Sequence, residues 1–287
     1  MIGAPSLPLP LPFPFELAFM QRALVAGVVV GVFAPLIGTF LVQKRMSLIG
    51  DGIGHVAFAG VGAGIIAGVY PVWTALLFAV VGALGIEWLR ARRKASGDLA
   101  LALFFYSGIA LGAVLANAKG GLGTSVIGFL FGHALTVDAV EVVVILLLGS
   151  LVVGLVIALR RVLFAIVTDE DWSGVTGLPV TAMNALLAVL TAVAVVAAMQ
   201  IVGILLIAAL MVLPVATGQL LARSFKGTLR VAVAVGVGSV VVGLTSSRLW
   251  GLAPGGAIVL VSALVFLVIA IARHTIPRGS LLEMPEP

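Results

Sequence analysis

The chain has 287 residues, of which 62% are hydrophobic and only 9% are charged, and its formal net charge is +5. A mean hydropathy of +1.31 excludes an ordinary soluble domain. The Lys and Arg residues stand in short clusters between apolar stretches, which is typical of membrane-protein loops and argues against nucleic-acid binding. The chain contains no cysteine, so disulfides and thiolate metal sites are excluded.

The chain divides into a tail, a long apolar region and a second tail. Residues 1–17 carry prolines at positions 5, 8, 10, 12 and 14 and no basic cluster, so we expect an extended extracytoplasmic tail and no cleavable signal peptide. Residues 18–273 are expected to form one transmembrane domain, and residues 274–287 a cytoplasmic tail.

Apolar stretches of about 20 residues recur along the chain, and each can cross a bilayer core of roughly 30 Å. The predicted helices cover 18–42, 53–69, 72–89, 99–117, 137–159, 180–199, 201–219, 229–247 and 256–273. The apolar block 180–219 is too long for a single crossing, so we divide it near Met199–Gln200. The predicted fold class is an all-α polytopic membrane protein with about nine transmembrane helices, with eight as the alternative.

The distribution of basic residues supports this count. With the N-terminus outside, thirteen Lys and Arg residues fall in cytoplasmic loops and three fall outside. The outer three are Arg22, Lys119 and Arg248. Such a positive-inside excess favours nine spans and a cytoplasmic C-terminus.

Two ionisable residues stand one helical turn apart where the second predicted span begins. They are Asp51 and His55, within "KRMSLIGDGIGHVAFAG" (44–60). A carboxylate and an imidazole on one helix face can hold a divalent metal ion, and two ligands suit a site that must release it. Alternatively, Asp51 caps its helix and His55 hydrogen-bonds to a neighbouring span, or the two residues relay protons.

The other acids and histidines are weaker candidates for chemistry. We expect Glu87 to pair with Arg90 at a cytoplasmic helix end. Asp138 and Glu141 occupy the first turn of a predicted helix that begins on the outer side, where the helix dipole stabilises negative charge. His133, in "FGHAL" (131–135), is a candidate for contacting the substrate at an outer mouth.

Two cytoplasmic stretches are candidates for contact with a partner. "VTDEDWSGVTGL" (167–178) contains Thr168 three residues before Asp171, which predicts a capping box and a short exposed helix. "LPVATGQLLARSFKGTLR" (213–230) is basic and amphipathic. No Walker A motif is present, so this chain cannot power transport by ATP hydrolysis alone, and we expect neither enzymatic activity nor a permanently bound cofactor.

Several motifs in register resemble the membrane permeases of ATP-driven zinc, manganese and iron importers. The resemblance runs from about residue 20 to residue 273. Its most specific part is Arg45-Met46-Ser47 followed by Gly50-Asp51 and His55. The other matching stretches are "DLALALFFYSGIALG" (98–112), "GFLFGHAL" (128–135), "IVGILLIAALMVLPVATGQLLARS" (201–224) and "APGGAIVL" (253–260).

This resemblance implies a homodimer in the lipid bilayer of the bacterial cytoplasmic (inner) membrane, with a fold similar to the vitamin B12 importer permease. Each copy would bind a cytoplasmic ABC ATPase and receive Zn²⁺ or Mn²⁺, with Fe²⁺ as a further option, from an extracytoplasmic metal-binding protein. Asp51 and His55 would line the metal path. The ATPase-coupling residues implied by the resemblance are Pro214, Ala216, Gln219, Leu220, Arg223 and Gly227.

The chain departs from the family pattern in its last outer loop. In "SRLWGLAPGG" (247–256), Gly251 stands where relatives often carry an aspartate, and His133 is a candidate to compensate for the missing acid. Three other functions stay open: a permease for a chelated metal or a cobalamin-like ligand, a secondary metal or proton transporter, and a structural membrane subunit.

Overall fold

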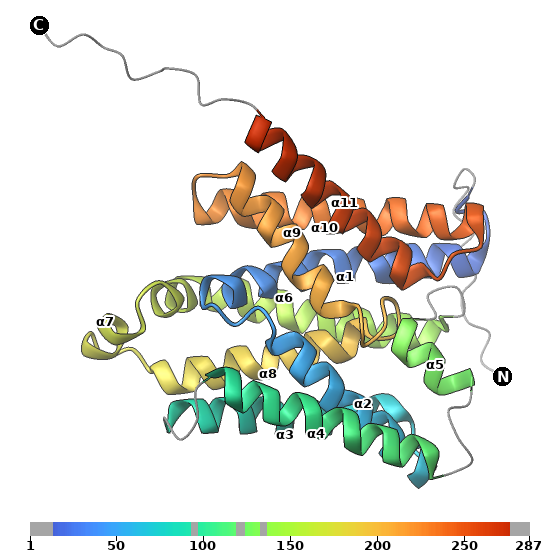
Figure 1. Ribbon diagram of the computed structural model, residues 1–287, viewed down its shortest axis with the longest axis horizontal. Helices are drawn as coiled ribbons and strands as arrows, with labels where there is room; N and C mark the ends of the chain where they lie inside the picture. Colours follow the sequence, from blue (N-terminus) through green and yellow to red (C-terminus); the bar gives the residue numbers. More distant parts are fainter. Residues whose placement is uncertain (1–13, 93–96, 119–123, 133–136, 276–287) are drawn as a thin grey trace, which may run out of the picture.

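The computed structural model describes residues 14–92, 97–118, 124–132 and 137–275, and across these ranges its regular structure is entirely helical. The expected all-α fold is therefore confirmed for this part of the chain (Figure 1). His133 and most of both tails lie outside the described residues, so the predictions made for them stay predictions.

Eight of the described helices are long and apolar enough to span a membrane. They are α1 (Ala18–Gln43), α2 (Ile49–Ala67), α3 (Pro71–Ala91), α4 (Gly97–Asn117), α6 (Ala139–Thr168), α8 (Val180–Ala198), α10 (Phe225–Trp250) and α11 (Pro254–Thr275). The apolar helix α9 (Ile207–Leu221) is shorter, at 15 residues. Eight long helices and one short apolar helix agree with the expected eight to nine. The remaining helices, α5 (Thr124–Phe131) and α7 (Glu170–Val175), are short.

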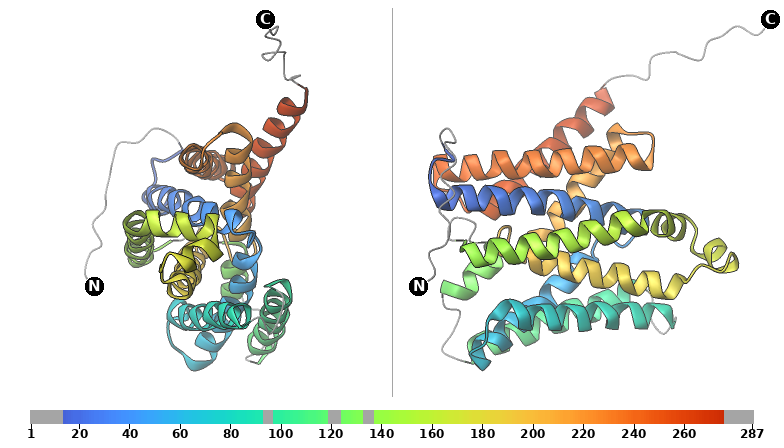
Figure 2. Two further views of the ribbon diagram at one scale, coloured as in Figure 1. Left: turned by 90° about the vertical axis from the view of Figure 1, so that its left-hand side faces the viewer. Right: turned by 180° about the vertical axis from the view of Figure 1, so that it is seen from behind.

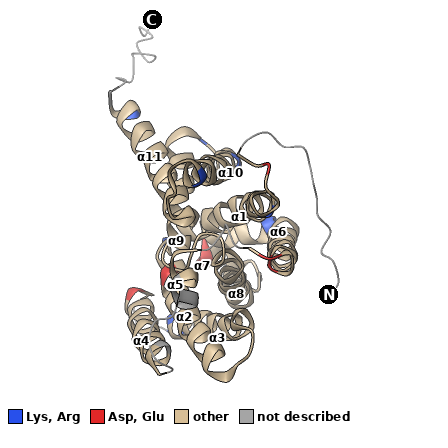
Figure 3. Cartoon of the chain, turned by 90° about the vertical axis from the view of Figure 1, so that its right-hand side faces the viewer, with Lys and Arg blue, Asp and Glu red and all other residues tan. Residues whose placement is uncertain are grey.

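The chain runs back and forth between two ends of the bundle. In Figure 1 the connections 44–48 and 222–224 and helix α7 lie at one end, and α5 and the α10–α11 connection lie at the other. Charge is sparse along the helices (Figure 3). Lys44, Arg90 and Arg223 belong to the α7 end of the bundle, so we assign that end to the cytoplasm by the positive-inside rule.

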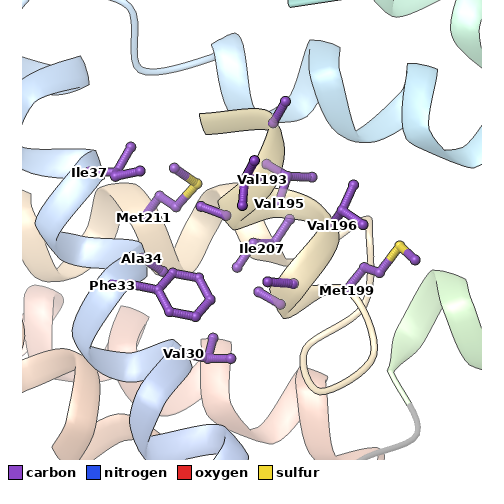
Figure 4. Packing of buried hydrophobic residues seen from close by; sticks show 14 of the residues in the cluster. Val30, Phe33, Ala34, Ile37, Val193, Val195, Val196, Met199, Ile207 and Met211 are labelled. Carbon is purple, nitrogen blue, oxygen red and sulfur yellow. The ribbon is translucent and has the colours of Figure 1, made fainter. Parts of the chain in front are cut away.

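The core is built where α1 crosses the break between α8 and α9. Figure 4 shows Phe33 and Ile37 of α1 close to Met211 of α9, and all three side chains are buried. Lipid tails are as apolar as these side chains, so close van der Waals packing holds the helices together. Glycine permits a very close approach here: a Cβ on Gly38 would lie 1.9 Å from the Met211 carbonyl oxygen.

The small residues of "GVGAGIIAG" (60–68) pack α2 against α3. A Cβ on Gly60 would lie 2.7 Å from the Ala75 Cα, and one on Gly64 would lie 2.3 Å from the Thr74 hydroxyl oxygen. These glycines therefore allow the two helices to pack closely.

Helix α6 is longer than predicted. The expected helix ended at residue 159, before the Arg160–Arg161 pair, but α6 continues to Thr168. Nothing in this stretch breaks a helix, and Leu163 and Ile166 stay buried beyond the two arginines. The Arg160–Arg161 pair therefore does not end the helix.

The block after α8 also differs from the prediction. Its break near Met199–Gln200 is confirmed, since α8 ends at Ala198, but the next helix begins at Ile207 and not at residue 201. Gly203 has a φ of +91°, and a Cβ there would lie 2.4 Å from the Leu130 carbonyl oxygen. The segment 199–206 instead pairs with α5, where the Ile204 N–H donates to the Phe129 carbonyl at 3.0 Å.

The short cytoplasmic helix predicted within 167–178 is present as α7, but its cap is not the predicted one. Asp169 is the N-cap, and its carboxylate accepts a hydrogen bond from the Trp172 N–H at 2.9 Å. The Thr168 hydroxyl instead donates to the Phe164 carbonyl within α6. Because α6 runs on through Thr168, the cap falls one residue later than expected.

Candidate metal site and coupling segment

Asp51 and His55 both lie on α2, and the helical period places them on one face. Both residues are half-buried. At a spacing of four residues, two side chains on a helix have Cβ atoms about 5–6 Å apart. The carboxylate and the imidazole can therefore reach the same ion, as the sequence predicts.

Helix α4 supports His55 from one side. The His55 ring meets the Phe105 ring edge to face, with ring centroids 4.5 Å apart. A Cβ on Gly108 would lie 2.7 Å from the His55 carbonyl carbon, so only glycine lets α4 approach α2 this closely. Phe105 and Gly108 thus hold His55 in place without occupying its ring nitrogens.

Neither the Asp51 carboxylate nor the His55 imidazole has a hydrogen-bond or ion-pair partner among the described residues. Asp51 lies in the first turn of α2, where the helix dipole favours a carboxylate, but the N-cap is Leu48 and no side chain caps the helix. The alternative of a capping aspartate and a hydrogen-bonded histidine is thus not seen in these ranges. Both polar groups keep their coordinating atoms available.

Two ligands do not make a closed metal centre. Within the described ranges, no group of three or more His, Asp or Glu residues is placed to hold a metal ion. Structural metal sites use a full set of protein ligands, whereas a transit site must let its ion leave. The Asp51–His55 pair has the composition of a transit site.

Helix α9 supports the metal pair from the other side. A Cβ on Gly50 would lie 3.4 Å from both the Met211 sulfur and the Ala208 Cβ. A Cβ on Gly54 would lie 3.3 Å from Ile204, just before α9 begins. The glycine row of α2 therefore contacts α9 next to the row that carries Asp51 and His55.

The segment 214–227 forms a helix–turn–helix junction. Pro214 is buried inside α9, which ends at Leu221, and Phe225 begins α10. The Ser224 hydroxyl caps α10 by accepting a hydrogen bond from the Gly227 N–H at 3.1 Å. Helices α9 and α10 thus continue almost to the turn 222–224, which alone separates them.

The residues of this segment differ in accessibility. Gln219 and Arg223 are exposed, whereas Ala216, Leu220 and Gly227 are half-buried. A cavity of about 320 Å³ opens beside them, between the turn and the cytoplasmic ends of α1 and α6. The lining includes Gln219, Arg223 and Thr168.

A second polar cluster lies at the outer end of the bundle. The nearly fully buried Gln200 amide donates hydrogen bonds to Glu141 at 2.9 Å and to the Tyr70 hydroxyl at 3.2 Å. Burial raises the pKa of Tyr70. The nearby Glu141 charge raises it further, whereas the hydrogen bond from Gln200 lowers it.

Asp138 and Glu141 form a capping box at the start of α6, which confirms their predicted place at a helix N-terminus.

A third polar cluster lies at the cytoplasmic end. Arg90 donates two hydrogen bonds to Glu87, at 2.8 and 2.9 Å, so the predicted pair is confirmed. Glu170 lies 3.4 Å from both Lys44 and Arg90 and accepts a hydrogen bond from the Asn184 amide at 2.8 Å. The sequence did not predict these contacts of Glu170.

Burial and the neighbouring charges together shift the pKa values of Glu170 and Lys44. Burial raises the pKa of Glu170, but Lys44, Arg90 and the Asn184 hydrogen bond outweigh burial and leave it below its ordinary value. Burial, helped by Arg90, lowers the pKa of Lys44 in spite of the Glu170 carboxylate.

Gly251 ends α10 as a left-handed C-cap with a φ of +64°. Glycine adopts this conformation without strain. Gly251 therefore has a local structural role, and as a glycine it offers no side-chain ligand.

These features place the chain in a known family. The family model described as "ABC 3 transport family" matches residues 16–273, which is most of the chain. The chain belongs to the ABC 3 transport family. This membership and the eight apolar helices of spanning length make it a multi-pass membrane transport protein.

Named relatives match over nearly their full lengths. A manganese transport system membrane protein of Halalkalibacterium halodurans is 32% identical over 92% of this chain and 90% of its own. A manganese import system permease protein of Streptococcus gordonii is 33% identical over 87% of this chain and 90% of its own. Each is a relative of this ABC 3 family member.

Solved structures agree on the fold. PsaBC from Streptococcus pneumoniae, in complex with a Fab, matches with a TM-score of 0.80 and 31% identity, covering 88% of this chain and 91% of its own. An inward-facing metal-chelate type ABC transporter matches with a TM-score of 0.72 over 94% of this chain and 93% of its own. At 18% identity, the second match supports the fold alone.

Proposed function

We propose that this chain is the permease subunit of an ABC importer for Mn²⁺. The observation that carries the proposal is the Asp51–His55 pair on α2, whose coordinating atoms have no partner among the described residues. The named manganese permeases among its relatives support Mn²⁺ as the cargo. Carboxylate oxygen suits Mn²⁺, although imidazole is shared with Zn²⁺ sites.

The mechanism follows from the surroundings of the pair. An ion arriving from the outer side exchanges part of its water shell for the Asp51 carboxylate and the His55 imidazole. Water or a second copy of this chain supplies the remaining ligands, and two weak contacts allow release. Helix α9 contacts α2 through Gly50 and ends at the cytoplasmic turn, so movement of the turn reaches the pair.

An uptake experiment tests the cargo. Cells without their own importers express this chain with a matched ATPase and a metal-binding protein, and elemental analysis measures the accumulated metals. We expect Mn²⁺ to accumulate only when the ATPase is present. Uptake without the ATPase would instead establish a secondary transporter, and failure to take up any metal would favour the chelate alternative.

The exposed part of the turn is the proposed contact with the ATPase. Arg223 is exposed beside the cavity that separates the turn from α1 and α6. We expect Arg223→Glu to weaken co-purification of the ATPase by about tenfold or more, as reversal of a contact charge does. Arg248→Glu makes the same charge change at the outer end of α10 and should leave co-purification unchanged. Equal losses in both variants would contradict the proposed contact.

A further inference from the structure

The ion pairs found among the described residues all meet in one cytoplasmic cluster. This cluster joins elements that are far apart in the sequence. Lys44 follows α1, Arg90 lies in the last turn of α3, Glu170 begins α7, and Asn184 lies in the first turns of α8. Glu170 contacts the other three side chains, so it is the centre of the cluster.

Lys44 is firmly held within this cluster. Its side chain is only 6% exposed, and it donates a hydrogen bond to the Asn184 amide oxygen in addition to the ion pair with Glu170. Removing a lysine from water is costly unless its charge is paired. Glu170 therefore determines where the end of α1 can lie.

The turn that follows Lys44 leaves little freedom before α2 begins. The Arg45 N–H donates to the Val42 carbonyl, and the Met46 N–H donates to the Leu41 carbonyl. Arg45 has a φ of +59°, which is strained for a residue other than glycine. Backbone hydrogen bonds continue through Ile49 to Asp51, seven residues after Lys44. The place of Lys44 thus fixes the start of α2.

Asn184 connects the cluster, along the chain, to the segment 214–227 that is proposed to contact the ATPase. Asn184 lies on α8, and α8 is followed by the segment 199–206, by α9 and by the turn 222–224. Glu170 thus links the start of α2, which carries Asp51, to the start of the chain segment that ends at the proposed ATPase contact.

We infer that Glu170 is a positioning residue for the metal path: it holds Lys44 against α8 and thereby sets the position of Asp51. This inference rests on the proposed role of Asp51. It assigns Glu170 no contact with the ion. Loss of the ion pair moves the turn 44–48 and displaces Asp51 from its place beside His55.

The absence of cysteine from the chain gives a direct measure of this turn. Ser47→Cys places a single thiol in the turn, and its rate of labelling by a maleimide reports the exposure of the turn in the purified permease without metal. Ser47 is half-buried, so the rate can rise or fall. Mn²⁺ uptake with the ATPase and the binding protein gives the apparent KM and the maximal rate separately.

In the Ser47→Cys permease, Glu170→Gln and Lys44→Met should each speed labelling of the thiol. Each should raise the apparent KM for Mn²⁺ by about tenfold, as expected when a residue that orients a ligand is lost. The double variant should be no worse than the single variants, because both remove the same contact. Lys44→Arg should retain most of the wild-type KM. The matched control is Asp171→Asn, an exposed acid of α7 that should leave both measurements unchanged.

Three outcomes would overturn the inference. Faster labelling without a change in KM would mean that the cluster only stabilises the fold. Additive effects of the two substitutions would exclude the route through Lys44. Unchanged labelling in Glu170→Gln would show that the turn does not depend on the ion pair, even if no Mn²⁺ uptake is found. If the unmodified chain itself takes up no Mn²⁺, the proposed function fails, and the labelling result still tests the role of Glu170 separately.

Discussion

Asp51→Asn is expected to reduce Mn²⁺ uptake by about 10- to 100-fold while leaving the amount of folded permease unchanged. The asparagine keeps the size of the side chain but removes the negative charge that draws the ion from water. The Asp51 carboxylate accepts no hydrogen bond from the described residues, so the substitution breaks no side-chain hydrogen bond within this part of the fold. Initial uptake rates, measured by elemental analysis with the ATPase and binding protein present, check this expectation.

The control for this prediction lies on the neighbouring helix. Asp98 is also an acid in the first turn of its helix, α4, and it is exposed. Asp98→Asn therefore makes the same chemical change away from the pair and should leave uptake unaffected. His55→Ala should match the loss in Asp51→Asn if both residues hold the same ion. Wild-type uptake in Asp51→Asn would move the path elsewhere, and a loss in Asp98→Asn would point to a general charge effect.

The long helices could be predicted from the sequence because their signal is local. Nearly every residue of α1 or α11 is apolar, and length alone then indicates a span. The non-helical segment 199–206 carries the same apolar signal but is shaped by distant contacts. Gly203 and Gly132 both adopt positive φ, where α5 and this segment meet. No local pattern indicates that meeting, so α5 and the late start of α9 were missed.

The candidate site divides in the same way. The common face of Asp51 and His55 follows from the helical period, which the sequence shows directly. Phe105 and Glu170 contact residues that are distant in sequence, so no local pattern points to a role for them. Glu170 meets Lys44 from 126 positions away in the chain, and only the fold brings them together. Residues that hold a site in place therefore need the structure, whereas residues that touch the cargo carry a local signal.

Gly38→Ala is expected to destabilise the permease strongly. The added Cβ would lie 1.9 Å from the Met211 carbonyl oxygen and 2.8 Å from the carbonyl carbon, and backbone atoms in a helix cannot rotate away. Overpacking of this kind costs about 1–3 kcal/mol or more, because α1 and α9 must separate. Gly154→Ala is the matched control, since it is also a glycine within a long helix but has no heavy atom within 4 Å of its added Cβ. Thermal unfolding of the two variants in detergent measures the difference.

Gly38→Ala should also displace Asp51 and His55. Its effect on uptake per folded molecule therefore distinguishes it from a substitution that only lowers stability. Met211 is the residue whose sulfur lies 3.4 Å from a Cβ built on Gly50, next to Asp51. Pushing α9 away from α1 therefore shifts the surface on which α2 rests. Uptake per folded molecule of Gly38→Ala should fall below wild type, while Gly154→Ala should keep full uptake. Normal uptake by the remaining folded Gly38→Ala would mean that α9 supports the fold but does not carry movement to Asp51 and His55.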